Sequence, residues 1–119
     1  MESKIRRFRD LRVWQKSIEL VKAIYSATKS FPEEEKYGLV QQMKRSAISV
    51  PSNIAEGFRR KHQKEYRQFL YIALGSCAEL DTQVVIAKEL NFIDNQKEIV
   101  ITELIDYICR MIVNLQKKL

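Results

Sequence analysis

The chain is poor in residues that interrupt regular structure. It has three glycines and two prolines in 119 residues. No segment alternates apolar and polar residues as a half-buried strand does. So few turn formers leave room only for a small number of short connections. The composition therefore predicts an all-α protein.

Histidine is almost absent. His62 is the only one, which argues against a histidine-based metal site and a Ser-His-Asp constellation, and we expect it to be an exposed turn residue. Glu33, Glu34 and Glu35 are consecutive, so on a helix their side chains point about 100° apart and do not converge on one ion. A glycine-rich phosphate loop is also missing. We expect no catalysis, no metal and no cofactor.

Long hydrophobic runs are missing as well. No apolar run approaches the roughly 20 residues needed to cross a bilayer. The start, MESKIRRFRD, lacks the apolar core of a signal peptide. Cys77 and Cys109 lie on helical stripes and not in a spaced disulfide framework. A hydrophobic content of 45% argues against wholesale disorder. These features predict a cytoplasmic protein with no membrane partner.

Positive charge is abundant and unevenly spread. The net charge is +6; residues 1–67 hold 16 Lys and Arg against 8 Asp and Glu, whereas residues 68–119 hold 5 against 7. The cations form two clusters, one before and at the start of the first predicted helix and one at the turn after the second. The clusters consist of Arg6, Arg7, Arg9, Arg12, Arg59, Arg60, Lys61 and Lys64. Such asymmetry favours a polyanionic partner, although a solvated basic surface is the simpler alternative.

Four apolar stripes with three- and four-residue spacing predict four helices in one domain. The third predicted stripe is Tyr66, Leu70, Ala73, Cys77, Leu80, Val84 and Ala87, and the fourth is Ile101, Leu104, Ile108, Met111 and Leu115. We expect residues 1–9 to be a basic N-terminal arm and residues 10–119 to be the bundle. Asp10 is the expected N-cap of the first helix, and Pro32 the first residue of the second, with the acidic triplet in its first turn. Asn91 should end the third helix, and Asp94 or Asn95 should cap the fourth. That helix carries more apolar surface than a monomeric bundle needs, which predicts self-association.

The segment RSAISVPSNIAEGFRRK, residues 45–61, continues one apolar stripe past a proline. Because the stripe keeps its phase from Met43 to Phe58, we expect Pro51 to kink the second helix and not to end it. A polar face runs beside the stripe, and we expect its Arg45 to form an ion pair with Glu56 of the same helix or with Glu79 of the third helix. On the third helix, Gly75 and Ser76 predict a close approach of a neighbouring helix. The structural polar motif consists of Arg45, Ser49, Asn53, Glu56 and Glu79.

Together with DLRVWQKS, FPEEEKYGL and FLYIALGSCAEL, this segment resembles the four-helix-bundle proteins of the ribosomal-RNA intervening-sequence family. That family also includes the accessory variability determinants of diversity-generating retroelements. The resemblance covers residues 8–95 and implies an antiparallel up-and-down four-helix bundle that forms a homopentameric ring. In the retroelement branch it implies binding to nucleic acid or to a reverse transcriptase. The chain departs from the family at Arg59 and Lys61, where small residues are common, and at His62, where a Ser or Thr caps the helix.

Two functions remain open at this point. The first is a non-enzymatic, basic oligomer that binds RNA or DNA through phosphate contacts of the two cationic clusters. In an up-and-down bundle, the start of the first helix and the end of the second lie at the same end, so we expect one basic rim. The alternative is a protein scaffold, for example for a reverse transcriptase, with only incidental nucleic-acid binding.

Overall fold

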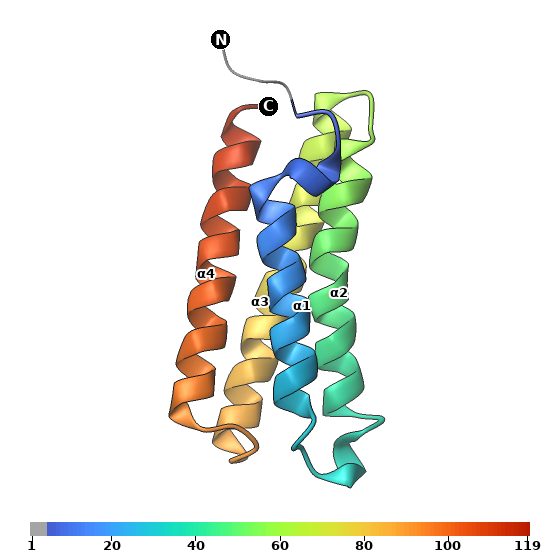
Figure 1. Ribbon diagram of the computed structural model, residues 1–119. Coiled ribbons are helices and arrows are strands. Elements are labelled where there is room, and N and C mark those ends of the chain that lie inside the picture. Colours follow the sequence, from blue (N-terminus) through green and yellow to red (C-terminus); the bar gives the residue numbers. More distant parts are fainter. Residues whose placement is uncertain (1–4) are drawn as a thin grey trace.

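A computed structural model describes residues 5–119 of the chain. Helices account for most of it, and no strand occurs within these residues. The elements are η1 (Phe8–Asp10), α1 (Arg12–Thr28), η2 (Glu33–Glu35), α2 (Leu39–Phe58), α3 (Gln63–Glu89) and α4 (Asn95–Lys117), where η denotes a short 3-10 helix. The four long helices run up and down beside one another (Figure 1). Helix α1 packs against α2 and α4, and α3 packs against the same two. The predicted all-α class with four helices is confirmed.

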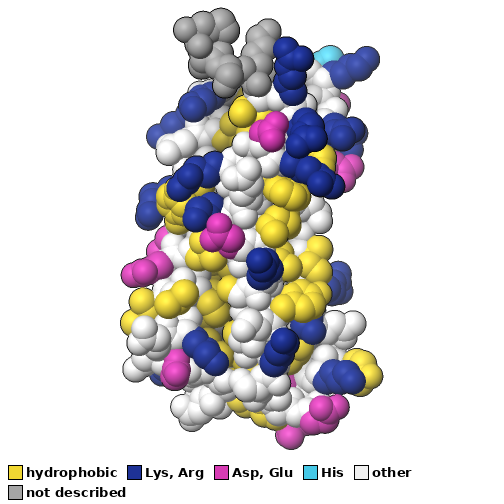
Figure 2. All heavy atoms as spheres, viewed as in Figure 1, with side chains coloured by type: hydrophobic (Ala, Val, Ile, Leu, Met, Phe, Trp, Pro, Cys, Tyr) yellow, Lys and Arg dark blue, Asp and Glu magenta, His cyan; other side chains and the backbone are white. Residues whose placement is uncertain are grey.

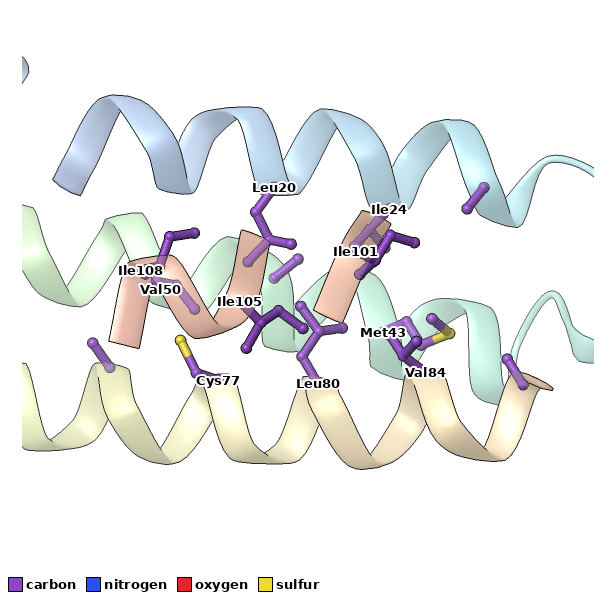
Figure 3. Packing of buried hydrophobic residues seen from close by; sticks show 14 of the residues in the cluster. Leu20, Ile24, Met43, Val50, Cys77, Leu80, Val84, Ile101, Ile105 and Ile108 are labelled. Carbon is purple, nitrogen blue, oxygen red and sulfur yellow. The ribbon is translucent and has the colours of Figure 1, made fainter. Parts of the chain in front are cut away.

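The core follows the apolar stripes of the four helices (Figure 3). In α3 the predicted stripe from Leu70 to Ala87 is buried at every apolar position, and only its first member, Tyr66, is half-buried. In α4 the predicted stripe is partly wrong, because Ile105 and Ile112 are buried where we expected Leu104 and Met111. The α4 helix contacts both α1 and α3, so its buried face is turned toward the groove between them.

The start of the first helix differs from the prediction. Asp10 is not its N-cap, since it ends η1, and α1 begins at Arg12 with Leu11 as a cap that makes no side-chain hydrogen bond. The ring of Phe8 packs on Trp14, with centroids 5.5 Å apart, and the 3-10 turn folds the chain back to make this contact. Of the predicted arm, residues 1–4 lie outside the described part, while Phe8 and Arg9 belong to η1.

The start of the second helix also differs. Pro32 does not begin α2; the acidic triplet forms the separate turn η2, and α2 begins only at Leu39. Phe31, on the other side of this turn, is buried with its ring centroid 5.3 Å from that of Phe92. The chain must leave this aromatic pair and turn before Val40 enters the core, which a continuous helix from Pro32 does not allow.

Helix α2 passes through Pro51 without a break. The predicted continuity of the helix is therefore confirmed, whereas a kink stays a prediction. Near its end, Gly57 lies so close to α3 that a Cβ there would be 2.9 Å from Phe69 Cβ. Gly57 is therefore the glycine that permits close packing of α2 on α3. The prediction for Gly75 was wrong, because nothing lies within 4 Å of a Cβ at that position.

The remaining helix ends agree with the sequence. His62 precedes α3, is exposed and makes no side-chain cap. Asn91 follows α3 with φ 63°, the left-handed conformation common after a helix. Asp94 caps α4 by accepting a hydrogen bond from the Lys97 amide at 2.8 Å. Helix α3 is long and apolar enough to span a membrane by length and composition alone, but eight of its residues are buried in the bundle. Core helices of soluble proteins meet the same criterion, so this is weak support for a membrane span.

Candidate functional site

The two cationic clusters meet at one end of the bundle. This end holds η1, the turn from α2 to α3 and the last turn of α4 (Figure 1). The guanidinium carbon of Arg59 lies 5.5 Å from the centroid of the Phe8 ring, which joins the two clusters directly. Figure 2 shows cationic side chains gathered over this upper part of the molecule. We call this surface the basic end.

All eight cations predicted as nucleic-acid-binding are exposed. Some are held in place by neighbours. Arg60 donates to a carboxylate oxygen of Glu56 at 3.0 Å and lies 4.7 Å from the centroid of the Phe69 ring. The Nε atom of Arg7 lies 3.9 Å from Oδ2 of Asp10, which makes a loose ion pair between exposed side chains. The acids at this end thus orient single arginines but are fewer than the cations around them.

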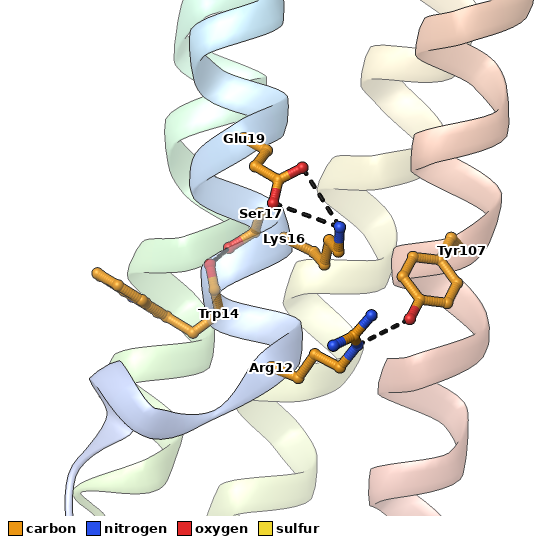
Figure 4. A network of polar contacts seen from close by, with 6 residues as sticks. All are labelled: Arg12, Trp14, Lys16, Ser17, Glu19 and Tyr107. Carbon is orange, nitrogen blue, oxygen red and sulfur yellow. Dashed lines mark hydrogen bonds and ion pairs between the residues drawn. The ribbon is translucent and has the colours of Figure 1, made fainter.

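Tyr107, Lys16 and Arg67, at or near the basic end, were not among the predicted site residues. Arg12 donates through Nε to the hydroxyl of Tyr107 on α4 at 2.9 Å (Figure 4), and this hydrogen bond raises the pKa of Arg12. The Nζ atom of Lys16 lies 5.9 Å from the centroid of the Tyr107 ring. Arg67 donates to the backbone carbonyl of Leu119, which holds the end of α4 against α3. No local pattern points to these contacts, because Arg12 and Tyr107 are 95 residues apart.

A hollow of about 440 Å³ opens between η1 and the last two turns of α2. Small side chains leave this space open, since Ala55 and Ser52 lie where the helix faces η1. Cationic, aromatic and acidic groups surround them. The hollow is lined by Phe8, Ser52, Ala55, Glu56, Arg59 and Arg60. We call this space the η1 hollow. Phe8 was not among the predicted site residues, although its position between arginines in RRFRD was a usable signal.

The structural polar motif is only partly assembled. Ser49 Oγ lies 2.8 Å from Ser76 Oγ on α3, and Asn53 donates to the carbonyl and the hydroxyl of Ser49 at 2.8 and 2.9 Å. Arg45 and Glu79 line the same groove of about 250 Å³ between α2 and α3. The Ser49–Ser76 contact ties α2 to α3, whereas the two Asn53 bonds lie within α2.

The expected ion pair of Arg45 was wrong. Within residues 5–119 it has no carboxylate oxygen within 4.0 Å, and Glu56 pairs with Arg60. Glu56 is eleven positions beyond Arg45 on the same helix, about 16 Å along its axis, whereas Arg60 is one turn away. Glu79 shares the groove with Arg45 but does not reach it.

The described residues offer little for metal or thiol chemistry. No three of their His, Cys, Asp and Glu side chains group to hold a metal ion. Cys77 is buried on α3, and a hydrogen bond with Cys109 together with burial raises the pKa of its thiol. The same hydrogen bond lowers the pKa of Cys109, which is half-buried on α4. Cys77 is thus a poor nucleophile in this setting.

Comparisons with known proteins place the chain among similar folds. A family model described as 23S rRNA-intervening sequence protein matches residues 9–114. A crystal structure of a protein of unknown function, from the S23 ribosomal protein family of Bacteroides thetaiotaomicron VPI-5482, superposes with a TM-score of 0.81. The two chains are 23% identical, and the match covers 88% of this chain and 95% of the other. No curated protein matches the chain significantly.

Proposed function

The chain belongs to the 23S rRNA-intervening sequence protein family. We propose that it is a non-enzymatic oligomer that binds RNA or DNA through phosphate contacts at its basic end. The observation that carries the proposal is the meeting of two sequence-distant cationic clusters, from η1 and from the α2–α3 turn, on one surface. Clustered cations raise the local potential and attract a polyanion, which scattered charges do not. Because the contacts go to phosphates, the binding has little sequence preference.

Salt dependence tests the proposal. If binding neutralises about five phosphates, log K should fall against log salt with a slope of roughly −4. Replacing Arg59, Arg60 and Lys61 together with Ala should weaken binding to all sequences and flatten this slope. The measurement is fluorescence anisotropy with labelled RNA and DNA across a salt series.

The opposite end of the bundle supplies a matched control. Lys29, Lys36 and Lys97 are far from the basic end, and their replacement with Ala removes the same charge. If this control weakens binding as much as the triple change at the α2–α3 turn, only net charge matters and the proposed surface is wrong. Absence of any binding at low salt would refute the proposed function itself.

We also propose that several chains assemble, with the homopentameric ring of the family resemblance as the expected form. Apolar side chains on the outer faces of α3 and α4 support self-association, because a monomeric bundle gains nothing from them. They are Tyr71, Ile72, Val85, Ile86, Ile99, Val100 and Val113, each between 38% and 59% exposed. Light scattering should give a mass near five chains, and a monomer at micromolar concentration would contradict this.

The same apolar faces favour a second candidate function, a scaffold for a partner protein. In that case the basic end contributes only incidental binding to nucleic acid. The two candidates differ in a simple test. Replacement of Ile99 and Val100 with Ser should abolish capture of the partner protein in the scaffold case, while RNA binding by the basic end persists. If wild-type protein binds no nucleic acid and remains assembled, the scaffold becomes the better proposal.

A further inference from the structure

We propose that the η1 hollow accepts one unpaired base of a single-stranded nucleic acid, so that the basic end prefers single strands to duplexes. The inference rests on the proposed nucleic-acid binding and adds to it the kind of strand that is bound. It follows from what lines the hollow, which differs from the rest of the basic end. A purely phosphate-binding surface needs cations alone, whereas this hollow combines an aromatic ring, a guanidinium, small side chains and a carboxylate.

The aromatic and guanidinium groups suit the flat face of a base. Phe8 is half-buried, held at one side by the ring of Trp14, so its position is set before any ligand binds. The guanidinium carbon of Arg59 lies over the same ring, 5.5 Å from its centroid, and Arg59 also lines the hollow. Aromatic rings and arginine planes are the two platforms on which unstacked bases commonly rest.

The size of the hollow is adequate for a base. Its volume is about 440 Å³, and it is a shallow hollow open to solvent, so it can receive the flat face of a base without enclosing the base. Ala55 and Ser52 keep it open, since a larger side chain at either position would fill the space in front of η1. Arg59 and Arg60, which begin the α2–α3 turn, line the hollow, so a strand that contacts the cations of this turn passes its opening.

Glu56 decides between a base and a phosphate inside the hollow. One of its carboxylate oxygens accepts the bond from Arg60, and the other has no hydrogen-bond donor in the described part of the chain. A phosphate in the hollow would meet this negative charge, whereas the N–H groups on the edge of a base can donate to it. The phosphates therefore stay on the exposed cations outside, and the neutral base enters.

Paired bases cannot make this contact. Inside a duplex each base is stacked on its neighbours and its pairing edge is occupied, so only the backbone reaches the protein. A duplex should thus bind through the exposed cations alone. A single strand gains the additional contact in the hollow, which predicts a measurable difference in affinity.

The test compares strands and two conservative substitutions. The probes are labelled single strands of about 8–12 nucleotides, as RNA and as DNA, and the corresponding duplexes. Phe8→Leu keeps the apolar contact but removes the ring, and Arg59→Lys keeps the charge but removes the planar guanidinium. We expect each change to weaken single-strand binding about fivefold or more, in line with the loss of one stacked base. Duplex binding and the salt slope should change little.

Matched controls come from outside the hollow. Tyr37→Leu removes an exposed aromatic ring beyond η2, and Arg110→Lys changes an exposed arginine on α4. Neither should alter strand preference. Circular dichroism and thermal unfolding establish that each variant keeps the wild-type fold. A fluorescent adenine analogue placed along the single strand should change its emission at one position on binding to wild-type protein but not to the Phe8→Leu variant.

The outcomes separate the two proposals. Equal binding of single strands and duplexes, or single-strand binding unchanged in both hollow variants, overturns the base site while the proposed function stands. Failure of every probe to bind at low salt overturns both. If wild-type protein prefers single-stranded RNA to single-stranded DNA and both variants lose this preference, the base site is supported and RNA is the nucleic acid that it binds. If wild-type protein binds both single strands equally and both variants bind them more weakly, the base site is supported for either nucleic acid.

Discussion

Gly57 and Gly75 provide the sharpest test of the packing, because the same substitution should act in opposite directions. A Cβ at Gly57 would lie 2.9 Å from Phe69 Cβ, 3.0 Å from Tyr66 Cδ1 and 3.2 Å from the Tyr66 carbonyl oxygen. The Phe69 Cβ and the Tyr66 carbonyl are fixed to the α3 backbone and cannot swing aside. A Cβ at Gly75 would meet nothing within 4 Å.

The expected magnitudes follow from overpacking and helix propensity. Inserting a methyl group into a packed interface costs about 1–3 kcal/mol, and the gain in helix propensity near the end of α2 offsets at most about 1 kcal/mol of this. Gly57→Ala should therefore lower the free energy of unfolding by about 0.5–2 kcal/mol. Gly75→Ala has only the propensity gain and should raise it by about 0.5–1 kcal/mol.

Urea unfolding followed by circular dichroism, at one fixed protein concentration, measures both changes. Constant concentration matters because assembly of several chains would add to the apparent stability. An unchanged slope with denaturant would show that the substitutions act on stability and not on the extent of unfolding. If Gly57→Ala proves as stabilising as Gly75→Ala, α2 and α3 do not approach each other as closely as these distances require.

Three further changes test other contacts. Asn53→Ala should lower the free energy of unfolding by about 1–3 kcal/mol in urea, because it removes two hydrogen bonds to Ser49 in a half-enclosed seam; a change within about 0.5 kcal/mol, as expected at a typical surface site, would argue against that seam. Asp94→Ala removes the cap on the Lys97 amide and should cost about 0.5–2 kcal/mol, whereas Asp94→Asn should retain most of the stability; equal losses in both variants would refute the cap. Burial raises the pKa of Tyr66 from 10.0 to about 12, so its neutral form stabilises the fold fully below pH 10, and this contribution is lost as the pH rises to about 12. Over that interval wild-type protein should lose more stability than Tyr66→Phe, and parallel curves would contradict the shift.

Periodicity and end signals predicted the architecture well. The α3 stripe from Leu70 to Ala87, the cap at Asp94 and the left-handed Asn91 all lie where the sequence placed them. These features depend on residues three or four positions apart, so they can be recognised from the sequence alone. The passage of α2 through Pro51 was predictable for the same reason, because the apolar stripe keeps its phase on both sides.

The errors occur where distant residues compete with local signals. The acidic triplet after Pro32 is a good local helix start, yet the packing of Phe31 on Phe92 requires a turn there. Asp10 is a good local cap, yet the contact of Phe8 with Trp14 requires η1. In both cases an aromatic contact, together with the apolar area that it buries, outweighs the about 0.5–2 kcal/mol that a favourable helix start provides.

The sequence alone therefore determined the number of helices, most of their buried faces, and the presence of two cationic clusters. Tertiary structure decided what those clusters form together. The relative positions of the helices and of η1 decide three features. These are the approach of Arg59 to Phe8, the hydrogen bond of Arg12 to Tyr107, and the space left by Ala55. These residues are separated by tens of positions, and no local pattern encodes the angle at which their helices meet. The candidate base site is a property of that packing, because a hollow exists only between elements and not within any one of them.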